Sequence, residues 1–127
     1  PTQIENVYLK SSRIDQIFII GDKREFLTAI IIPSEEAIRE QIPGKLELLV
    51  GDNEFILDDE LTAWLAQDAK KVGNQLAKFE RIKHFKLKRN PFTIEDGEIT
   101  PTLKAKRKVI EQKYADAISS MYTEDES

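Results

Sequence analysis

The sequence contains no cysteine, which excludes a disulfide framework, a thiol nucleophile and a cysteine-based zinc site. Its single histidine, His84, has no serine or second histidine near it in the sequence, so we expect a structural role for it rather than a catalytic one. Glycine-rich phosphate loops, EF-hand calcium loops and metal-ligand spacings are also missing. The chain therefore lacks a complete active site and a metal site of its own.

Long apolar runs are missing as well. No stretch approaches the roughly 18 apolar residues of a membrane-spanning helix, and no signal peptide is visible. The 127 residues are enough for one folded domain, over residues 1–127, and too few for two. The chain begins at Pro1 without an initiator methionine, and we expect it to be a piece of a longer protein. The lack of cysteine fits a reducing compartment, and we expect a cytoplasmic location.

Basic residues are scarce over most of the chain and concentrated in one segment. Residues 81–108 hold nine basic and three acidic side chains, a net charge of +6, whereas the rest of the chain carries −10. An acidic body with one basic segment can concentrate an anionic ligand on that segment. The alternative, which the composition by itself favours, is that these cations lie on solvated faces and bind nothing.

Hydrophobic periodicity predicts four helices and three strands. The helices are expected at residues 2–11, after the N-cap Ser34, at 58–76, and from near Pro101 to Tyr122. The strands are expected at residues 14–20, 26–32 and 85–88. The first two strands are joined by the short polar connection Gly21–Arg24, which favours an antiparallel hairpin.

Residues 42–57 are the least regular part of the sequence. They carry turn residues such as Pro43-Gly44 and Gly51-Asp52-Asn53 together with several leucines, and we expect a surface insertion with a small apolar face of its own. The order of elements predicts an α+β fold, a small three-stranded, mainly antiparallel sheet with flanking helices.

A turn, a helix-start signal and a group of cations lie close together after residue 95. Asp96-Gly97 indicates the turn, and Thr100 followed by Pro101 is typical of an N-cap and the first position of a helix. The cations follow at once: Lys104, Lys106, Arg107 and Lys108. Because a helix N-terminus carries a partial positive charge, cations are unfavourable there, and we interpret them as a site for an anion such as phosphate.

Three motifs are the most specific parts of the chain. They are Lys78-Phe79-Glu80-Arg81-Ile82-Lys83, Phe92-Thr93-Ile94-Glu95-Asp96-Gly97 and Thr100-Pro101-Thr102-Leu103-Lys104-Ala105-Lys106-Arg107. With the opening Ile4-Glu5 and Val7-Tyr8, they resemble the C-terminal lid domain of long-chain fatty acyl-CoA synthetases, in the adenylate-forming superfamily of AMP-binding enzymes. The resemblance covers Pro1 to Tyr122. It points to the long-chain branch because shorter-chain relatives more often have glycine at the position of Leu103.

The resemblance implies a two-step reaction. A fatty acid attacks ATP to give an acyl-adenylate and pyrophosphate, the lid domain rotates, and coenzyme A then attacks the adenylate to form a thioester. ATP, Mg²⁺ and coenzyme A are expected to bind mainly to an N-terminal adenylation domain, the expected partner of this chain. Without that domain the chain is expected to be inactive, and its peripheral association with a membrane stays open.

The resemblance also assigns the candidate site residues. Lys104 aligns with the catalytic lysine of the family, which reaches the carboxylate and the bridging phosphate oxygens during adenylation. A lysine suits this task because it is a mobile point charge. Lys106, Arg107 and Lys108 either contact phosphates of coenzyme A or stay solvated.

Two other classes of function compete with this interpretation. One is a small nucleic-acid-binding domain that uses the basic segment 81–108. Against it, the pI is about 5.1 and the aromatic residues do not form a stacking platform, so we expect no nucleic acid. The other is a protein-interaction module that uses the 42–57 insertion.

Overall fold

The chain forms two compact units, Pro1–Asn90 and Pro91–Ser127. The computed structural model describes residues 2–126, with side chains to Thr123. The first unit holds all the strands of the β-sheet, and the second holds the cations from Lys104 to Lys108. Within residues 2–126, none of the helices combines the length and the apolar character that crossing a membrane requires.

The sheet of the first unit is mixed and has four strands, in the order β1-β2-β4-β3. The strands are β1 (Ile14–Ile20), β2 (Leu27–Pro33), β3 (Phe55–Ile56) and β4 (Ile82–Lys88). β1 and β2 form the predicted antiparallel hairpin, whereas β2 and β4 pair in parallel. The α+β prediction is confirmed, but the sheet has one strand more than predicted, because β3 pairs antiparallel with β4.

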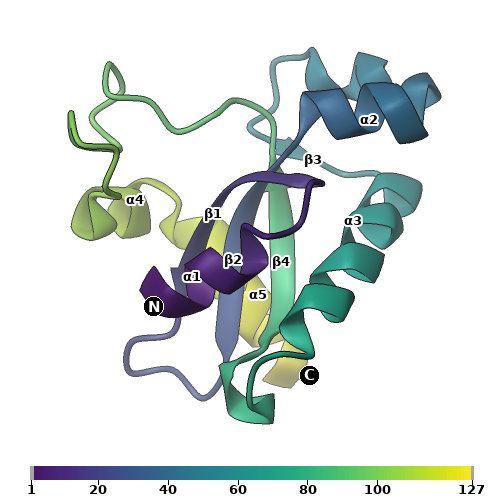
Figure 1. Cartoon of the computed structure of the whole chain (residues 1–127). Helices are drawn as coiled ribbons and strands as arrows, with labels where there is room; N and C mark the ends of the chain where they lie inside the picture. Colours follow the sequence, from purple (N-terminus) through teal and green to yellow (C-terminus); the bar gives the residue numbers. More distant parts are fainter. Residues whose placement is uncertain (1, 127) are drawn as a thin grey trace. The chain divides into compact units, whose positions relative to one another are not determined.

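Three α-helices of the first unit pack into the same core as the sheet. They are α1 (Thr2–Tyr8), α2 (Glu35–Gln41) and α3 (Asp59–Gly73), and α1 and α3 contact each other (Figure 1). Their apolar side chains form one core with residues from all four strands. Its members include Tyr8, Ile19, Ile31, Ile38, Ile56, Leu65 and Leu87. The strand β2 lies between β1 and β4 and is buried along almost its whole length, which fits its apolar run over residues 29–32.

Local sequence signals position the starts of α2 and α3 as predicted. The Ser34 hydroxyl accepts a hydrogen bond from the N–H of Ala37 at 3.2 Å, and the Asp58 carboxylate accepts one from the N–H of Leu61 at 2.9 Å. Both side chains are therefore N-caps, which satisfy amide groups that have no partner inside the helix.

The 42–57 insertion is more regular than expected. It contains the 3₁₀ helix η1 (Pro43–Leu49) and the strand β3, and Leu46, Leu48 and Leu49 pack against the core of the first unit. Val50 and Leu57 are exceptions, with relative exposures of 82% and 88%. Most of the other apolar residues of the insertion are used in folding, which leaves less apolar surface for the alternative of a protein-interaction module.

The second unit corrects the prediction of one long helix from Pro101 to Tyr122. Residues 98–106 form a short antiparallel hairpin, and helix α4 (Arg107–Lys113) begins only after it. A second helix, α5 (Ala115–Glu126), follows a break at Tyr114, whose backbone lies outside the helical region at φ −111° and ψ 26°. Thr100 is therefore a turn residue and does not cap a helix.

Candidate functional site

The candidate site is built on the hairpin of residues 98–106, which we term the basic hairpin. Its strands are joined by hydrogen bonds from the N–H of Thr100 to the C=O of Lys104 and from the N–H of Lys106 to the C=O of Glu98, both at 2.8 Å. Ile99 and Ala105 pair between these two bonds. Lys104 is the first residue after the loop, and its backbone is held on the returning strand.

The loop of the basic hairpin has three residues, and hydrogen bonds fix its conformation. The N–H of Leu103 donates to the C=O of Thr100 at 2.8 Å, which closes a β-turn with Pro101 at its second position. Leu103 then takes a left-handed conformation, with φ 66°. A turn followed by a left-handed residue is a common three-residue hairpin connection. The Thr100 hydroxyl also accepts a hydrogen bond from the N–H of Lys104 at 3.0 Å, which fixes the start of the returning strand.

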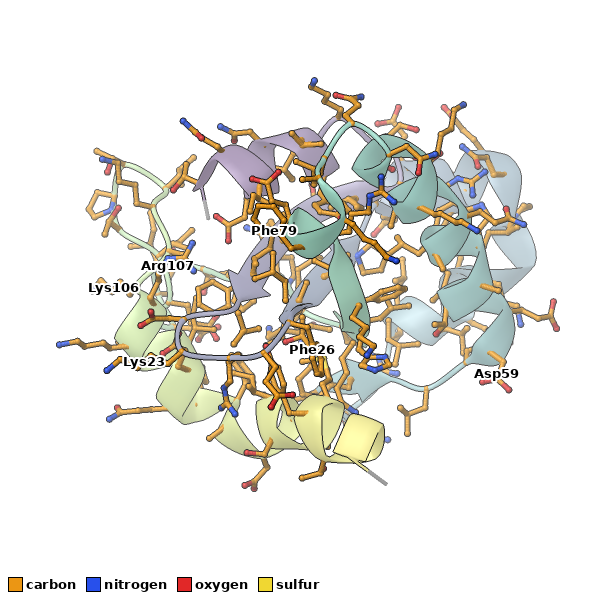
Figure 2. All side chains as sticks on the ribbon, turned by 90° about the horizontal axis from the view of Figure 1, so that it is seen from below. Lys23, Phe26, Asp59, Phe79, Lys106 and Arg107 are labelled. Carbon is orange, nitrogen blue, oxygen red and sulfur yellow. The ribbon has the colours of Figure 1, made fainter. Side chains whose placement is uncertain are left out.

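The side chains of the four predicted cations differ in their surroundings. Lys104 is exposed on the hairpin. Lys106 is the N-cap of α4, and Arg107 and Lys108 lie in its first turn. Figure 2 labels Lys106 and Arg107 at this end of the helix. Among the described side chains, none forms an ion pair with Lys104, Lys106 or Lys108. The first turn of α4 contains no acidic residue. Three of the four cations thus lie at the N-terminus of α4, which begins at Arg107 and not near Pro101 as predicted, and the fourth lies outside this helix.

A buried carboxylate that the sequence analysis did not single out holds the base of the basic hairpin. The Glu98 side chain has no exposed surface. Its carboxylate accepts hydrogen bonds from the hydroxyl of Tyr114 and from the N–H of Thr93, the latter at 3.4 Å, and it pairs with the Lys113 ammonium at 3.2 Å. Its backbone N–H also donates to the C=O of Thr93 at 3.1 Å. In the sequence, Glu98 is visible only as an acidic residue between Gly97 and Ile99 in a basic segment.

Two basic residues at the end of β4 and just after it, Lys88 and Arg89, are occupied by structural contacts. The Lys88 side chain is buried and donates to the C=O of Asn90. The Arg89 guanidinium donates to the C=O of Leu48 at 3.0 Å and to that of Asn53. Since these two cations satisfy backbone carbonyls, they are not available to a phosphate backbone, which leaves fewer cations for the nucleic-acid alternative.

His84 lies in a contact that fits the structural role expected for it. Its ring meets that of Phe26 edge-on, with the ring centroids 5.8 Å apart. The Lys83 ammonium lies over the same Phe26 ring at 4.8 Å.

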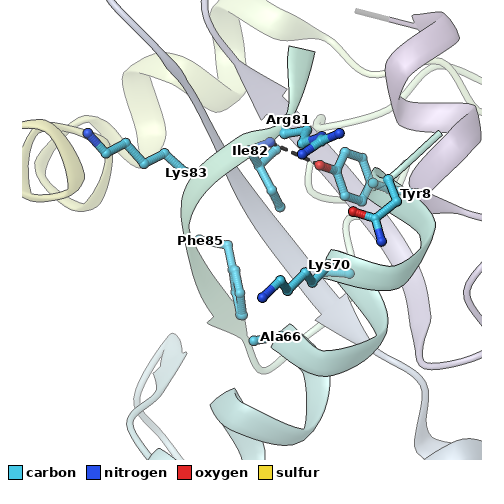
Figure 3. Close-up of a pocket in the computed structure, with 10 residues that line it drawn as sticks. Tyr8, Ala66, Lys70, Arg81, Ile82, Lys83 and Phe85 are labelled. Carbon is cyan, nitrogen blue, oxygen red and sulfur yellow. Dashed lines mark hydrogen bonds between the residues drawn. The ribbon is translucent and has the colours of Figure 1, made fainter. Parts of the chain in front are cut away.

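A cavity of about 340 Å³ lies in the first unit between α1, α3 and β4. Tyr8, Ile82 and Phe85 border it, and Figure 3 shows the Lys83 side chain directed away from the other labelled residues. Burial raises the pKa of the Tyr8 hydroxyl, although a hydrogen bond from the N–H of Ile82 at 2.9 Å and the charge of Arg81 act in the opposite direction. None of the four predicted site residues lines this cavity.

Comparison with known proteins identifies the family to which the chain belongs. The family model of AMP-binding enzyme C-terminal domains matches residues 1–126. The chain belongs to this family. Long-chain-fatty-acid–CoA ligase 5 of Rattus norvegicus is 34% identical to this AMP-binding enzyme C-terminal domain over 125 residues. Long chain acyl-CoA synthetase 6 (peroxisomal) of Arabidopsis thaliana is 33% identical over 127 residues.

These relatives are much longer than the domain. The alignments cover 96% of this chain and 18% of the rat protein, and 98% of this chain and 18% of the plant protein. The fold of the AMP-binding enzyme C-terminal domain also recurs in solved structures. The adenylation domain of a carboxylate reductase from Mycobacterium chelonae superposes with a TM-score of 0.75 at 23% identity, over 96% of this chain and 17% of that one. The A-PCP didomain of carboxylic acid reductase from Segniliparus rugosus, in complex with AMP, gives 0.74 at 24% identity, over 97% and 16%.

Proposed function

We propose that this chain is the lid domain of a long-chain fatty acid–CoA ligase. Membership of the AMP-binding enzyme C-terminal domain family and the resemblance to long-chain ligases over nearly the whole chain support this proposal. Because the chain spans 18% of the length of these relatives, the ATP pocket and the acyl site are assigned to an N-terminal adenylation domain. Fatty acid, ATP and coenzyme A are the proposed substrates of the complete enzyme.

The proposed role of Lys104 is to bring a positive charge to the reacting groups during adenylation. The fatty acid carboxylate and the phosphate of ATP are both anionic and repel each other as they approach. An ammonium between them offsets this repulsion and stabilises the charge that develops in the transition state. The observation that carries the proposal is that Lys104 is exposed, without an ion-pair partner among the described side chains, on a strand whose backbone is held by hydrogen bonds.

The binding sites for Mg²⁺ and coenzyme A are assigned to one domain or the other from the side chains that could bind them. Among the described residues, no cluster of three or more histidine or acidic side chains could hold a metal ion, so we place Mg²⁺ in the adenylation domain. Lys106, Arg107 and Lys108 are the residues that could contact phosphates of coenzyme A after the lid rotates. Rotation would move Lys104 away between the two steps.

Half-reactions of the full-length enzyme test the proposal. Lys104→Ala is expected to slow acyl-adenylate formation, measured as pyrophosphate release, by about 10² to 10³-fold, the effect typical of losing one electrostatic stabiliser. Thioester formation from supplied acyl-adenylate is expected to change little. Lys108→Ala, which removes an exposed cation four residues away, is the matched control and should have a small effect on adenylation. If Lys104→Ala slowed both half-reactions equally, the assigned role would be wrong.

A further inference from the structure

The buried Glu98 carboxylate has more polar partners than a short surface hairpin needs in order to form. The basic hairpin already has its own backbone hydrogen bonds at Thr100 and Lys106. Burying a carboxylate is unfavourable unless it is paired and fully hydrogen-bonded. Such a group therefore indicates a requirement beyond closing the hairpin.

The donors to Glu98 come from three separate places in the second unit. Thr93 precedes the basic hairpin, Lys113 is the last residue of α4, and Tyr114 is the break between α4 and α5. The Lys113 ammonium also lies 5.7 Å from the centre of the Tyr114 ring, and Phe92 meets this ring edge-on. The carboxylate thus ties the base of the hairpin to the far end of α4, so the hairpin cannot swing about its connection to the helix.

Glu98 and Lys104 lie on opposite strands of the same short hairpin. Thr100 is two residues from Glu98 along the chain and is hydrogen-bonded across the hairpin to Lys104. A change in the tilt of the hairpin base would therefore displace the Lys104 backbone. Since electrostatic catalysis depends on position, a misplacement of about 1 Å can reduce a rate by up to 10²-fold.

We propose that Glu98 is a positioning residue, which with Tyr114 and Lys113 fixes the orientation of the basic hairpin and so the point to which Lys104 is delivered. This inference rests on the proposed role of Lys104. Glu98 itself contacts neither substrate nor nucleotide in this proposal. Its effect should be confined to the step in which Lys104 acts.

The test uses Glu98→Gln in the full-length enzyme. Glutamine keeps the shape and one acceptor oxygen, but it places an amide donor or a neutral oxygen next to the Lys113 ammonium. We expect acyl-adenylate formation to fall by roughly 10- to 100-fold, with KM for ATP little changed and thioester formation from supplied acyl-adenylate within about twofold of wild type. Tyr114→Phe, which leaves the carboxylate and Lys113 in place, should cause a smaller loss of the same kind. Glu95→Gln is the matched control, because Glu95 is an exposed acid in the same segment, and it should have no effect.

The decisive measurement repeats Glu98→Gln in the Lys104→Ala background. If Glu98 acts through Lys104, it should produce no further loss of adenylation there. An equal loss in both backgrounds, a loss of both half-reactions together, or no loss in the single variant would overturn the positioning role. A failure of the proposed function is seen separately, because Lys104→Ala alone would then leave adenylation intact.

Discussion

The contact between Tyr8 and Gly73 allows a prediction in which one substitution reverses the effect of another on the free energy of unfolding. Tyr8 ends α1 and is almost fully buried, and its hydroxyl accepts a hydrogen bond from the N–H of Ile82 at the start of β4. Gly73 is the last residue of α3. A Cβ at position 73 would lie 3.0 Å from the Tyr8 hydroxyl and no closer than 3.5 Å to the ring carbons.

The magnitudes follow from these distances. Tyr8→Phe leaves the Ile82 N–H without its partner, which costs about 1–3 kcal/mol. The neighbouring cavity can admit water to this amide, so we expect about 1–2 kcal/mol of destabilisation. Gly73→Ala brings a gain of up to about 1 kcal/mol in helix propensity. In wild type this gain is opposed by crowding against a hydroxyl that its hydrogen bond holds in place, at about 1–3 kcal/mol.

Gly73→Ala is therefore expected to destabilise the wild-type chain by up to about 2 kcal/mol and to stabilise the Tyr8→Phe variant by about 0.5–1 kcal/mol. Urea unfolding followed by fluorescence measures both effects. Trp64 is the single tryptophan and lies in α3, so its signal reports on the first unit. An identical effect of Gly73→Ala in the two backgrounds would show that the hydroxyl does not limit this site and would refute the reasoning.

Two further predictions concern a helix cap and the loop of the basic hairpin. The pKa of Asp58 is lowered from 3.8, first by the hydrogen bond from the N–H of Leu61 and then by Lys45. The ionised carboxylate therefore contributes its full stabilisation above pH 3.8, and this stabilisation is lost as the pH falls through the lower pKa of the folded state. Asp58→Ala should thus reduce stability by about 0.5–2 kcal/mol at pH 7 and flatten the acid limb of the stability curve, as measured by urea unfolding at several pH values. Leu103→Gly should relieve about 1–2 kcal/mol of strain from the left-handed backbone conformation. Against this, glycine loses more conformational entropy on folding, which costs roughly 0.5–1 kcal/mol. The expected result is slower hydrogen exchange of the Lys106 amide, and faster exchange would contradict it.

Much of the first unit could be predicted because its signals are local. The caps Ser34 and Asp58 act within one helical turn, and the apolar spacing of α3 is a property of the helix itself. The parallel pairing of β2 with β4 could not be predicted in this way, since the partners are separated by the whole connection from α2 to α3. The strand β3 was missed because two residues, Phe55 and Ile56, carry no periodicity.

The basic hairpin shows where local rules give two answers. A proline at position 101 has the fixed φ near −65° that suits both the first turn of a helix and the second position of a β-turn. The preceding Thr100 is equally favourable as an N-cap or as a turn residue. The pairing of Ile99 with Ala105 and the burial of Glu98 select the turn.

The candidate lysine could be named from the sequence because it lies in a recognisable motif. The residues that surround it in the structure could not be predicted. Residue types alone determined that the chain has a cation-rich segment, no cysteine chemistry and an α+β pattern. Only the tertiary structure decided that Lys104 stands on a hairpin and that Glu98, Lys113 and Tyr114 meet beneath it. The physical reason is that hydrogen bonds within a turn depend on neighbouring residues, while a buried charge becomes favourable only when distant donors are brought to it by folding.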